Sequence, residues 1–85
     1  MDLGNFRYDT QFLIEGENLS KQAIQETIQA QFQGDCLLVV GDENLIKIHF
    51  HTNKPGDLLT YGSSIGEIFD IVVENMFRQA AGKKG

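Results

Sequence analysis

The sequence predicts an α+β domain in which a four-stranded antiparallel sheet carries two helices on one face. Two segments alternate apolar and polar residues with the period of two that is typical of strands, and two further apolar segments also read as strands. Two other segments repeat their apolar residues with the period of a helix. A chain of 85 residues has room for one hydrophobic core. We therefore expect a single domain spanning residues 1–85.

The first half of the chain contains a strand and a helix. Residues 6–14 alternate, which predicts a strand with one covered face. The helix is expected to start at Ser20, a favoured N-cap, with Leu19 stapled onto Ile24, and to end at Gly34. Its apolar positions recur every four residues, at Ile24, Ile28 and Phe32.

The second half contains a hairpin, a helix and a last strand. Residues 36–40 and 45–52 read as strands joined by the turn sequence GDEN. A weak helix is expected to begin near Pro55. Residues 67–76 predict the last strand, and residues 79–85 a disordered polar tail. The order β-α-β-β-α-β is that of the ferredoxin-like, split βαβ fold, with strand order 4-1-3-2.

Charge and composition limit the partners of the domain. The formal net charge of −5 opposes binding to nucleic acid and to anionic lipid. No apolar run approaches the length of a membrane span, and the N-terminus lacks the features of a signal peptide. Cys36 is the only cysteine, so no intrachain disulfide can form. We expect a cytoplasmic domain.

The only two histidines, His49 and His51, are one residue apart on the third predicted strand. Side chains at i and i+2 on a strand project to the same face, here the face opposite the helices. The first and third strands are central neighbours in this fold, which brings Asp9 close to both imidazoles. If the hairpin turn centres on Asp42 and Glu43, Cys36 lies opposite His49. These four residues are candidate metal ligands. The alternative is that they are ordinary polar residues on a solvated strand.

The start of the second helix offers a second candidate site. Asn53, Lys54 and Gly56 are expected to lie beside the histidines, where free backbone N–H groups and the Lys54 charge favour an anion such as a phosphate group of a cofactor. Ordinary helix capping explains the same residues.

Three segments resemble successive parts of the middle domain of bacterial fatty acid kinase, a member of the dihydroxyacetone-kinase-like family. These segments are RYDTQFLIEGENLS, DCLLVVGDENLIKIHFHTNKPGDLLTYG and GEIFDIVVENM, which cover nearly the whole chain. The most specific features are the pattern His-x-His-Thr-x-x-Pro-Gly and the later Glu-Asn-Met.

The resemblance implies a two-part enzyme. An all-helical nucleotide domain binds ATP and magnesium, and the middle domain supports dimerisation and contributes a Cys/His/His cluster tied to activity. Carried over, this cluster makes His49, His51 and Asp9 the candidate catalytic residues, with Asp9 at the cysteine position. Aspartate keeps a negative ligand for a zinc-like ion but loses the sulfur, which Cys36 is a candidate to replace. No Gly-rich phosphate loop is present, so this chain alone is not expected to phosphorylate a substrate.

Two classes of function follow. The first is an accessory domain of a phosphotransfer system, with a nucleotide-binding kinase domain or an acyl-binding protein as partner. The second is a dimerisation or ligand-sensing module without chemistry, with a homodimer formed through the open sheet face. An apolar stripe on that face favours dimerisation; it comprises Leu13, Leu38, Val40, Leu45 and Val72. RNA binding is disfavoured because the strand aromatics are expected on the covered face; these are Phe6, Tyr8, Phe12, Phe50 and Phe69.

Overall fold

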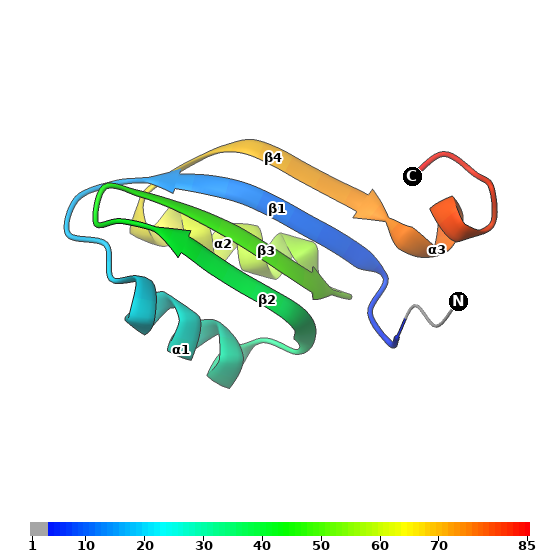
Figure 1. Ribbon diagram of the computed structural model, residues 1–85, viewed down its shortest axis with the longest axis horizontal. Coiled ribbons are helices and arrows are strands. Elements are labelled where there is room, and N and C mark those ends of the chain that lie inside the picture. Colours follow the sequence, from blue (N-terminus) through cyan, green and yellow to red (C-terminus); the bar gives the residue numbers. More distant parts are fainter. Residues whose placement is uncertain (1–3) are drawn as a thin grey trace.

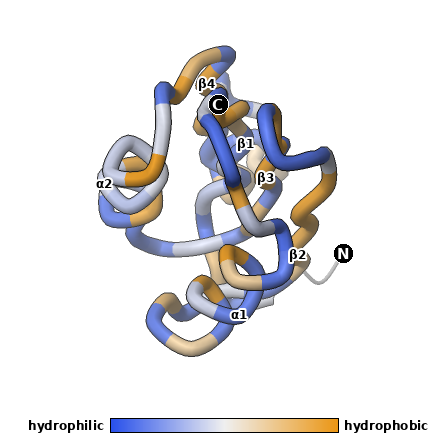
Figure 2. Tube along the Cα trace, turned by 90° about the vertical axis from the view of Figure 1, so that its left-hand side faces the viewer, coloured by the Kyte–Doolittle hydropathy of each residue, from blue (hydrophilic) through white to orange (hydrophobic). Residues whose placement is uncertain are grey.

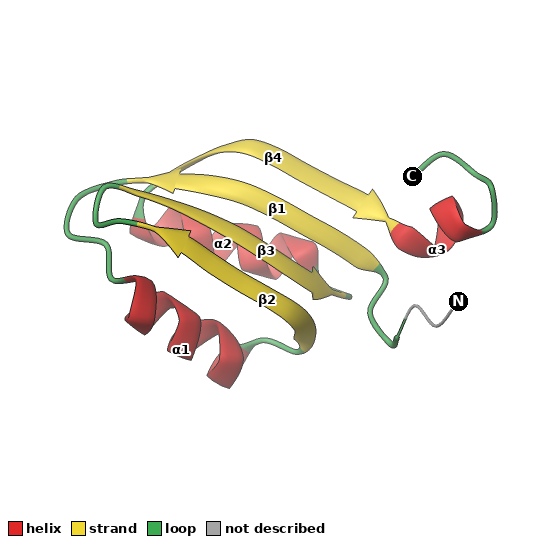
Figure 3. Ribbon diagram, viewed as in Figure 1, coloured by secondary structure: helices red, strands yellow, loops and turns green. Residues whose placement is uncertain are grey.

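The fold was analysed in a computed structural model, which describes residues 4–85. Four antiparallel strands form one sheet, and helices α1 and α2 pack on the same face of it (Figures 1 and 3). The elements in chain order are β1 (Tyr8–Glu15), α1 (Lys21–Gln31), β2 (Gly34–Gly41), β3 (Leu45–Thr52), α2 (Pro55–Ile65), β4 (Glu67–Asn75) and α3 (Met76–Ala80). The predicted α+β fold is confirmed.

The sheet has the order β2-β3-β1-β4, which is the predicted order read from the other edge. Strands β1 and β3 are therefore the central pair, and they run antiparallel (Figure 1). Their register places Asp9 opposite His51 and Gln11 opposite His49. This pairing sets the geometry of the candidate site.

The hydrophobic core fills the space between the sheet and the two helices. Both helices lie on the same side of the strands when the molecule is viewed end-on (Figure 2). Alternate residues of β1 and β3 point into this space, as the period of two predicts. The buried apolar residues are Phe12, Ile14, Ile24, Ile28, Val39, Ile46, Ile48, Phe50 and Leu58.

Helix α1 begins as predicted but ends earlier. The Ser20 hydroxyl accepts a hydrogen bond from the Ala23 N–H at 3.1 Å, which caps the first turn. The prediction that Gly34 ends the helix is wrong, because Phe32 already has extended backbone angles (φ −121°, ψ 139°). Gly34 instead starts β2.

Gly34 is required by close packing between β2 and β3. A Cβ atom at this position would lie 2.3 Å from the His51 carbonyl oxygen and 2.3 Å from the Phe50 ring. The Gly34→Ala variant is expected to lose about 1–3 kcal/mol of unfolding free energy, because the paired backbone cannot move aside. Urea denaturation measures the loss.

The matched control is Gly56→Ala in the first turn of α2, where an added Cβ meets no atom within 4 Å. Its stability should stay the same or rise slightly, since alanine is the better helix former. Equal stability of the two variants would contradict the packing argument at Gly34.

The β2–β3 hairpin has a different register from the predicted one. The turn is closed by a hydrogen bond from the Asp42 N–H to the Leu45 carbonyl at 2.9 Å. Backbone N–H groups of Asn44 and Leu45 donate to the Asp42 carboxylate, and they hold the pKa of Asp42 below its ordinary value. Leu38, and not Cys36, therefore lies opposite His49.

Irregularities in two edge strands shift side chains away from the predicted pattern. In β2 the register shifts between Asp35 and Leu38, and Cys36 has a positive φ of 55°. In β4 it shifts near Asp70, which has a φ of 50°. Phe69 consequently pairs with Leu13 on the open face, so its predicted place on the covered face is wrong.

The short helix α3 was not predicted. The Asn75 side chain caps it by accepting a hydrogen bond from the Arg78 N–H at 3.0 Å. Beyond the helix, the Lys83 N–H donates to the Arg78 carbonyl at 2.8 Å. The disorder predicted for residues 79–85 concerns the chain in solution and stays a prediction.

Candidate functional site

Asp9, His49 and His51 lie together on the open face of the sheet. Asp9 comes from β1 and the histidines from β3, and their buried neighbours Thr10 and Phe50 point to the opposite face. Their side chains are between 21% and 27% exposed. This partial burial lowers the local dielectric, so a bound cation would interact more strongly here than in bulk water. The predicted proximity of Asp9 to both imidazoles is confirmed.

The distances within this group fit a single metal ion. The Nε2 atoms of His49 and His51 are 3.1 Å apart, and the Asp9 Oδ1 lies 3.4 Å and 3.9 Å from them, respectively. The nearest point equidistant from the three atoms lies in their plane, about 2.0 Å from each, which is about the length of zinc–nitrogen and zinc–carboxylate bonds. Two imidazoles and one carboxylate are a donor set that zinc accepts, with a fourth position open to water or substrate.

Gln11 supports Asp9 and was missed in the sequence. Its side-chain N–H group donates to the Asp9 Oδ1 at 3.3 Å and to Oδ2 at 3.5 Å. Gln11 is two residues from Asp9 on the same face of β1 and opposite His49, so alternation and register together could have revealed it. Such a neighbour orients the carboxylate toward the imidazoles.

Cys36 does not join the group formed by Asp9 and the two histidines. It is exposed, and its possible ligand atom lies within 4.8 Å of those of Asp35 and His51 instead. Asp35 is opposite His51 in the sheet and was also missed. Its Oδ1 lies 3.6 Å from the His51 Nδ1.

The thiol of Cys36 is not activated as a nucleophile. The pKa of Cys36 is raised above its ordinary value. The larger cause is loss of hydration, and the smaller is the nearby negative charge of Asp35 and Asp9. A raised pKa keeps the free thiol protonated at neutral pH, when no cation is bound.

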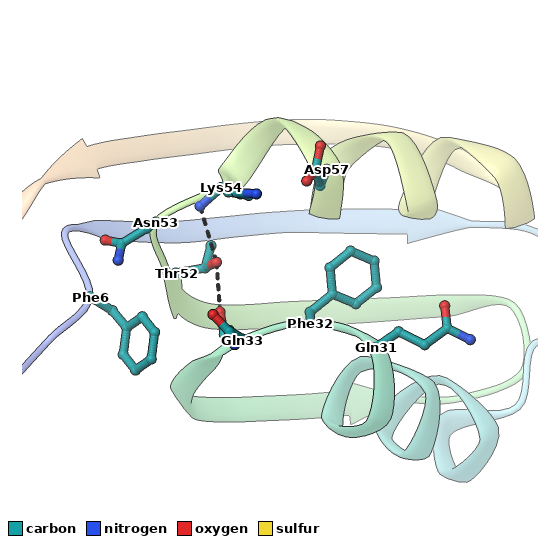
Figure 4. A pocket seen from close by; sticks show the side chains of 8 residues that line it. All are labelled: Phe6, Gln31, Phe32, Gln33, Thr52, Asn53, Lys54 and Asp57. Atoms are coloured by element: carbon teal, nitrogen blue, oxygen red, sulfur yellow. Dashed lines mark hydrogen bonds between the residues drawn. The ribbon is translucent and has the colours of Figure 1, made fainter.

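The start of α2 borders a cavity of about 490 Å³ (Figure 4). The predicted residues Asn53 and Lys54 line it, whereas Gly56 does not. Buried Thr52 links its walls, because the Thr52 hydroxyl donates to the Gln33 carbonyl at 2.9 Å and accepts from the Lys54 N–H at 3.2 Å. Gln31 at the end of α1 and Asp57 in the first turn of α2 also line it, so the cavity lies between the end of one helix and the start of the other.

This cavity and the histidines share one end of the sheet but not one face. Thr52 points into the covered side and His51 to the open side, so the expectation that the helix start opens beside the histidines is wrong. Asp57 also lines the cavity and places a negative charge in the first turn of α2. The Asn53 side chain is held by the Arg7 N–H at 2.8 Å and by the Asn5 carbonyl at 3.2 Å. Anion binding here stays a prediction.

The open face also carries the expected apolar residues. Leu38, Val40, Leu45 and Val72 are between 40% and 50% exposed, and Leu13 is partly buried between them. We refer to these five residues as the open-face stripe. Within residues 4–85, no helix is both long enough and apolar enough to cross a membrane.

Comparison with known proteins identifies one family. The FakA-like middle domain of fatty acid kinase matches residues 5–83. An uncharacterized protein of Staphylococcus saprophyticus is 41% identical over 78 residues, and one of Staphylococcus aureus is 40% identical over 76 residues. Both alignments cover 87% of this chain. The chain spans only 14% of the length of each relative.

Proposed function

The chain belongs to the family of FakA-like middle domains of fatty acid kinase, and we propose that it serves as an accessory domain of a fatty acid kinase or a related phosphotransfer system. In this role Asp9, His49 and His51 bind a metal ion, for which zinc is the best candidate. ATP and magnesium would be bound by a separate nucleotide-binding domain. An acyl-binding protein is a second candidate partner.

The observation that carries this proposal is the spacing of the three ligand atoms. Their mutual distances of 3.1, 3.4 and 3.9 Å fit one ion with bonds of ordinary length. The three side chains come from two central strands, which hold them in place before any ion arrives. Such preorganisation lowers the cost of binding.

When bound, a zinc ion would supply a Lewis acid that polarises a phosphoryl or carbonyl oxygen. The residues of this chain would hold the ion in place and balance part of its charge. The carboxylate of Asp9 offsets part of the positive charge, and Gln11 keeps that carboxylate facing the imidazoles. The neutral ring nitrogens fix the position of the ion on the open face, where a substrate on a partner domain has access.

Titration of the purified domain with zinc, with the heat of binding measured by calorimetry, tests this proposal. Zinc should bind at neutral pH and remain bound during dialysis. It should dissociate on acidification, because a protonated imidazole cannot ligate a metal. A domain that takes up no zinc at neutral pH would rule out the metal-binding role.

The open-face stripe favours a second function, which is dimerisation. Apolar side chains gathered on one sheet face are costly to leave in water. We propose that a second copy of the domain covers them in a symmetric dimer. The metal site lies on the same face, at the end of the sheet where β1 begins and β3 ends, so both functions hold together only if the dimer leaves that end uncovered.

The Leu45→Glu variant tests the dimer. Leu45 is 41% exposed, so glutamate is tolerated in the monomer but places a charge in an apolar interface. Sedimentation should show a dimer for the unchanged domain and a monomer for the variant. The control is Glu43→Gln in the neighbouring turn, which should remain a dimer. An unchanged domain that is monomeric at high micromolar concentration would exclude the homodimer.

A further inference from the structure

The imidazole of His51 lies between two different sets of metal-ligating groups. Its Nε2 atom is 3.1 Å from the His49 Nε2 and 3.9 Å from the Asp9 Oδ1. Its Nδ1 atom is 3.6 Å from the Asp35 Oδ1. The ligand atoms of Asp35, Cys36 and His51 lie within 4.8 Å of one another. The Nε2 atom therefore has a carboxylate and a second imidazole as neighbours, the Nδ1 atom has a carboxylate, and Cys36 lies within reach of the same ring.

The irregularity in β2 brings the second set together. Asp35 pairs opposite His51, and the register then shifts before Leu38 pairs opposite His49. Cys36 falls in this irregular stretch with a φ of 55°. A regular strand would send consecutive side chains to opposite faces, whereas here Asp35 and Cys36 both reach His51.

We propose that Asp35, Cys36 and the Nδ1 atom of His51 hold a second metal ion, so that the His51 ring bridges two ions. This inference rests on the proposed function for the first ion, which the Nε2 side of the ring would bind. The second position contains sulfur and suits a softer ion such as zinc better than magnesium.

The charges of the two sites balance. Asp9, Asp35, a Cys36 thiolate and a doubly deprotonated His51 ring carry one negative charge each, which matches the charge of two divalent ions. The thiol proton and the ring protons leave to solvent on binding. No electron transfer is involved.

The distance between the Asp35 carboxylate and the His51 Nδ1 atom fits two ligands of one metal ion better than it fits a direct hydrogen bond. The contact of 3.6 Å is longer than a hydrogen bond between nitrogen and oxygen. Two ligands of one tetrahedral zinc ion, with ordinary bond lengths, lie about 3.3–3.8 Å apart. Because the Asp35 side chain is 51% exposed, an ion can reach this position from solvent.

Titration with cobalt and zinc tests the second site in the 85-residue chain. Zinc calorimetry should give two ions per chain. A thiolate-to-cobalt charge-transfer absorption should accompany one of the two equivalents of cobalt, because only the position with Cys36 contains sulfur. Cys36→Ser and Asp35→Asn should each reduce the zinc count from two to one, and Cys36→Ser should remove the absorption.

Two further variants separate this inference from the proposed function. Glu43→Gln removes an exposed carboxylate outside both groups and should keep two ions. His49→Ala should lose the first ion and retain the sulfur absorption. One ion without sulfur absorption would overturn the second site and leave the first intact. One ion with sulfur absorption would overturn the two-ion arrangement, and no ion at all would overturn both sites.

Discussion

Replacing His49 by alanine is expected to lower the affinity of the first site for zinc by roughly a hundredfold or more. Loss of a residue that merely orients a metal ligand costs about 10–100-fold, and loss of the ligand itself should cost at least as much. After the change only Asp9 and His51 would remain. The measurement is competition with a chelator of known affinity, made in the Cys36→Ser background so that only the first site contributes.

Lys47→Ala is the matched control for this variant. Lys47 lies two residues before His49 on the same strand and the same face, but it is not among the grouped ligands. Its removal should leave zinc affinity within a few fold of the unchanged domain. If both variants bind zinc equally well, the first site does not use His49.

Replacing Phe12 by alanine is expected to destabilise the domain by roughly 3–5 kcal/mol. Phe12 is only 1% exposed and lies in the central strand β1. Its ring packs so closely on α2 that a Cβ added at Gly62 would lie 2.6 Å from it. Small domains have a total unfolding free energy of about 5–15 kcal/mol, so a large fraction of the Phe12→Ala molecules would be unfolded near physiological temperature.

Urea denaturation monitored by circular dichroism measures this loss. Gln25→Ala is the control, because Gln25 is exposed on α1, away from the open-face stripe, and should change stability by less than about 0.5 kcal/mol. Zinc binding should be lost together with structure in Phe12→Ala, since β1 also carries Asp9. A stable Phe12→Ala variant would contradict the assigned core.

The sequence was sufficient to place Asp9 beside the two histidines. Strand alternation put His49 and His51 on one face, and the split βαβ order made β1 and β3 antiparallel neighbours. Both inferences depend on regular strands in the centre of the sheet, where hydrogen bonding on two sides enforces the register. The same regularity made Gln11 predictable, although it was overlooked.

The surroundings of Cys36 could not be predicted in this way. The exact turn residues set the register of a hairpin, and the turn formed by Asp42 differs from the expected one. An edge strand also tolerates irregularities because it has only one bonded neighbour. The turn formed by Asp42 therefore moved Cys36 away from His49. The shift after Asp35 placed Asp35 rather than Cys36 opposite His51, and the shift near Asp70 moved Phe69 to the open face.

The match over residues 5–83 identifies a middle domain, and the relatives extend far beyond the part that this chain aligns with. The positions of Asp9, His49 and His51 support a metal role within that domain.

Diffraction from crystals of the zinc-loaded domain, with anomalous data collected on both sides of the zinc absorption edge, directly tests whether Asp9, His49 and His51 bind zinc. A zinc peak is expected about 2 Å from the Asp9 Oδ1 and from the Nε2 atoms of His49 and His51. Zinc-loaded crystals with no anomalous peak within bonding distance of these three atoms would contradict the proposed zinc site.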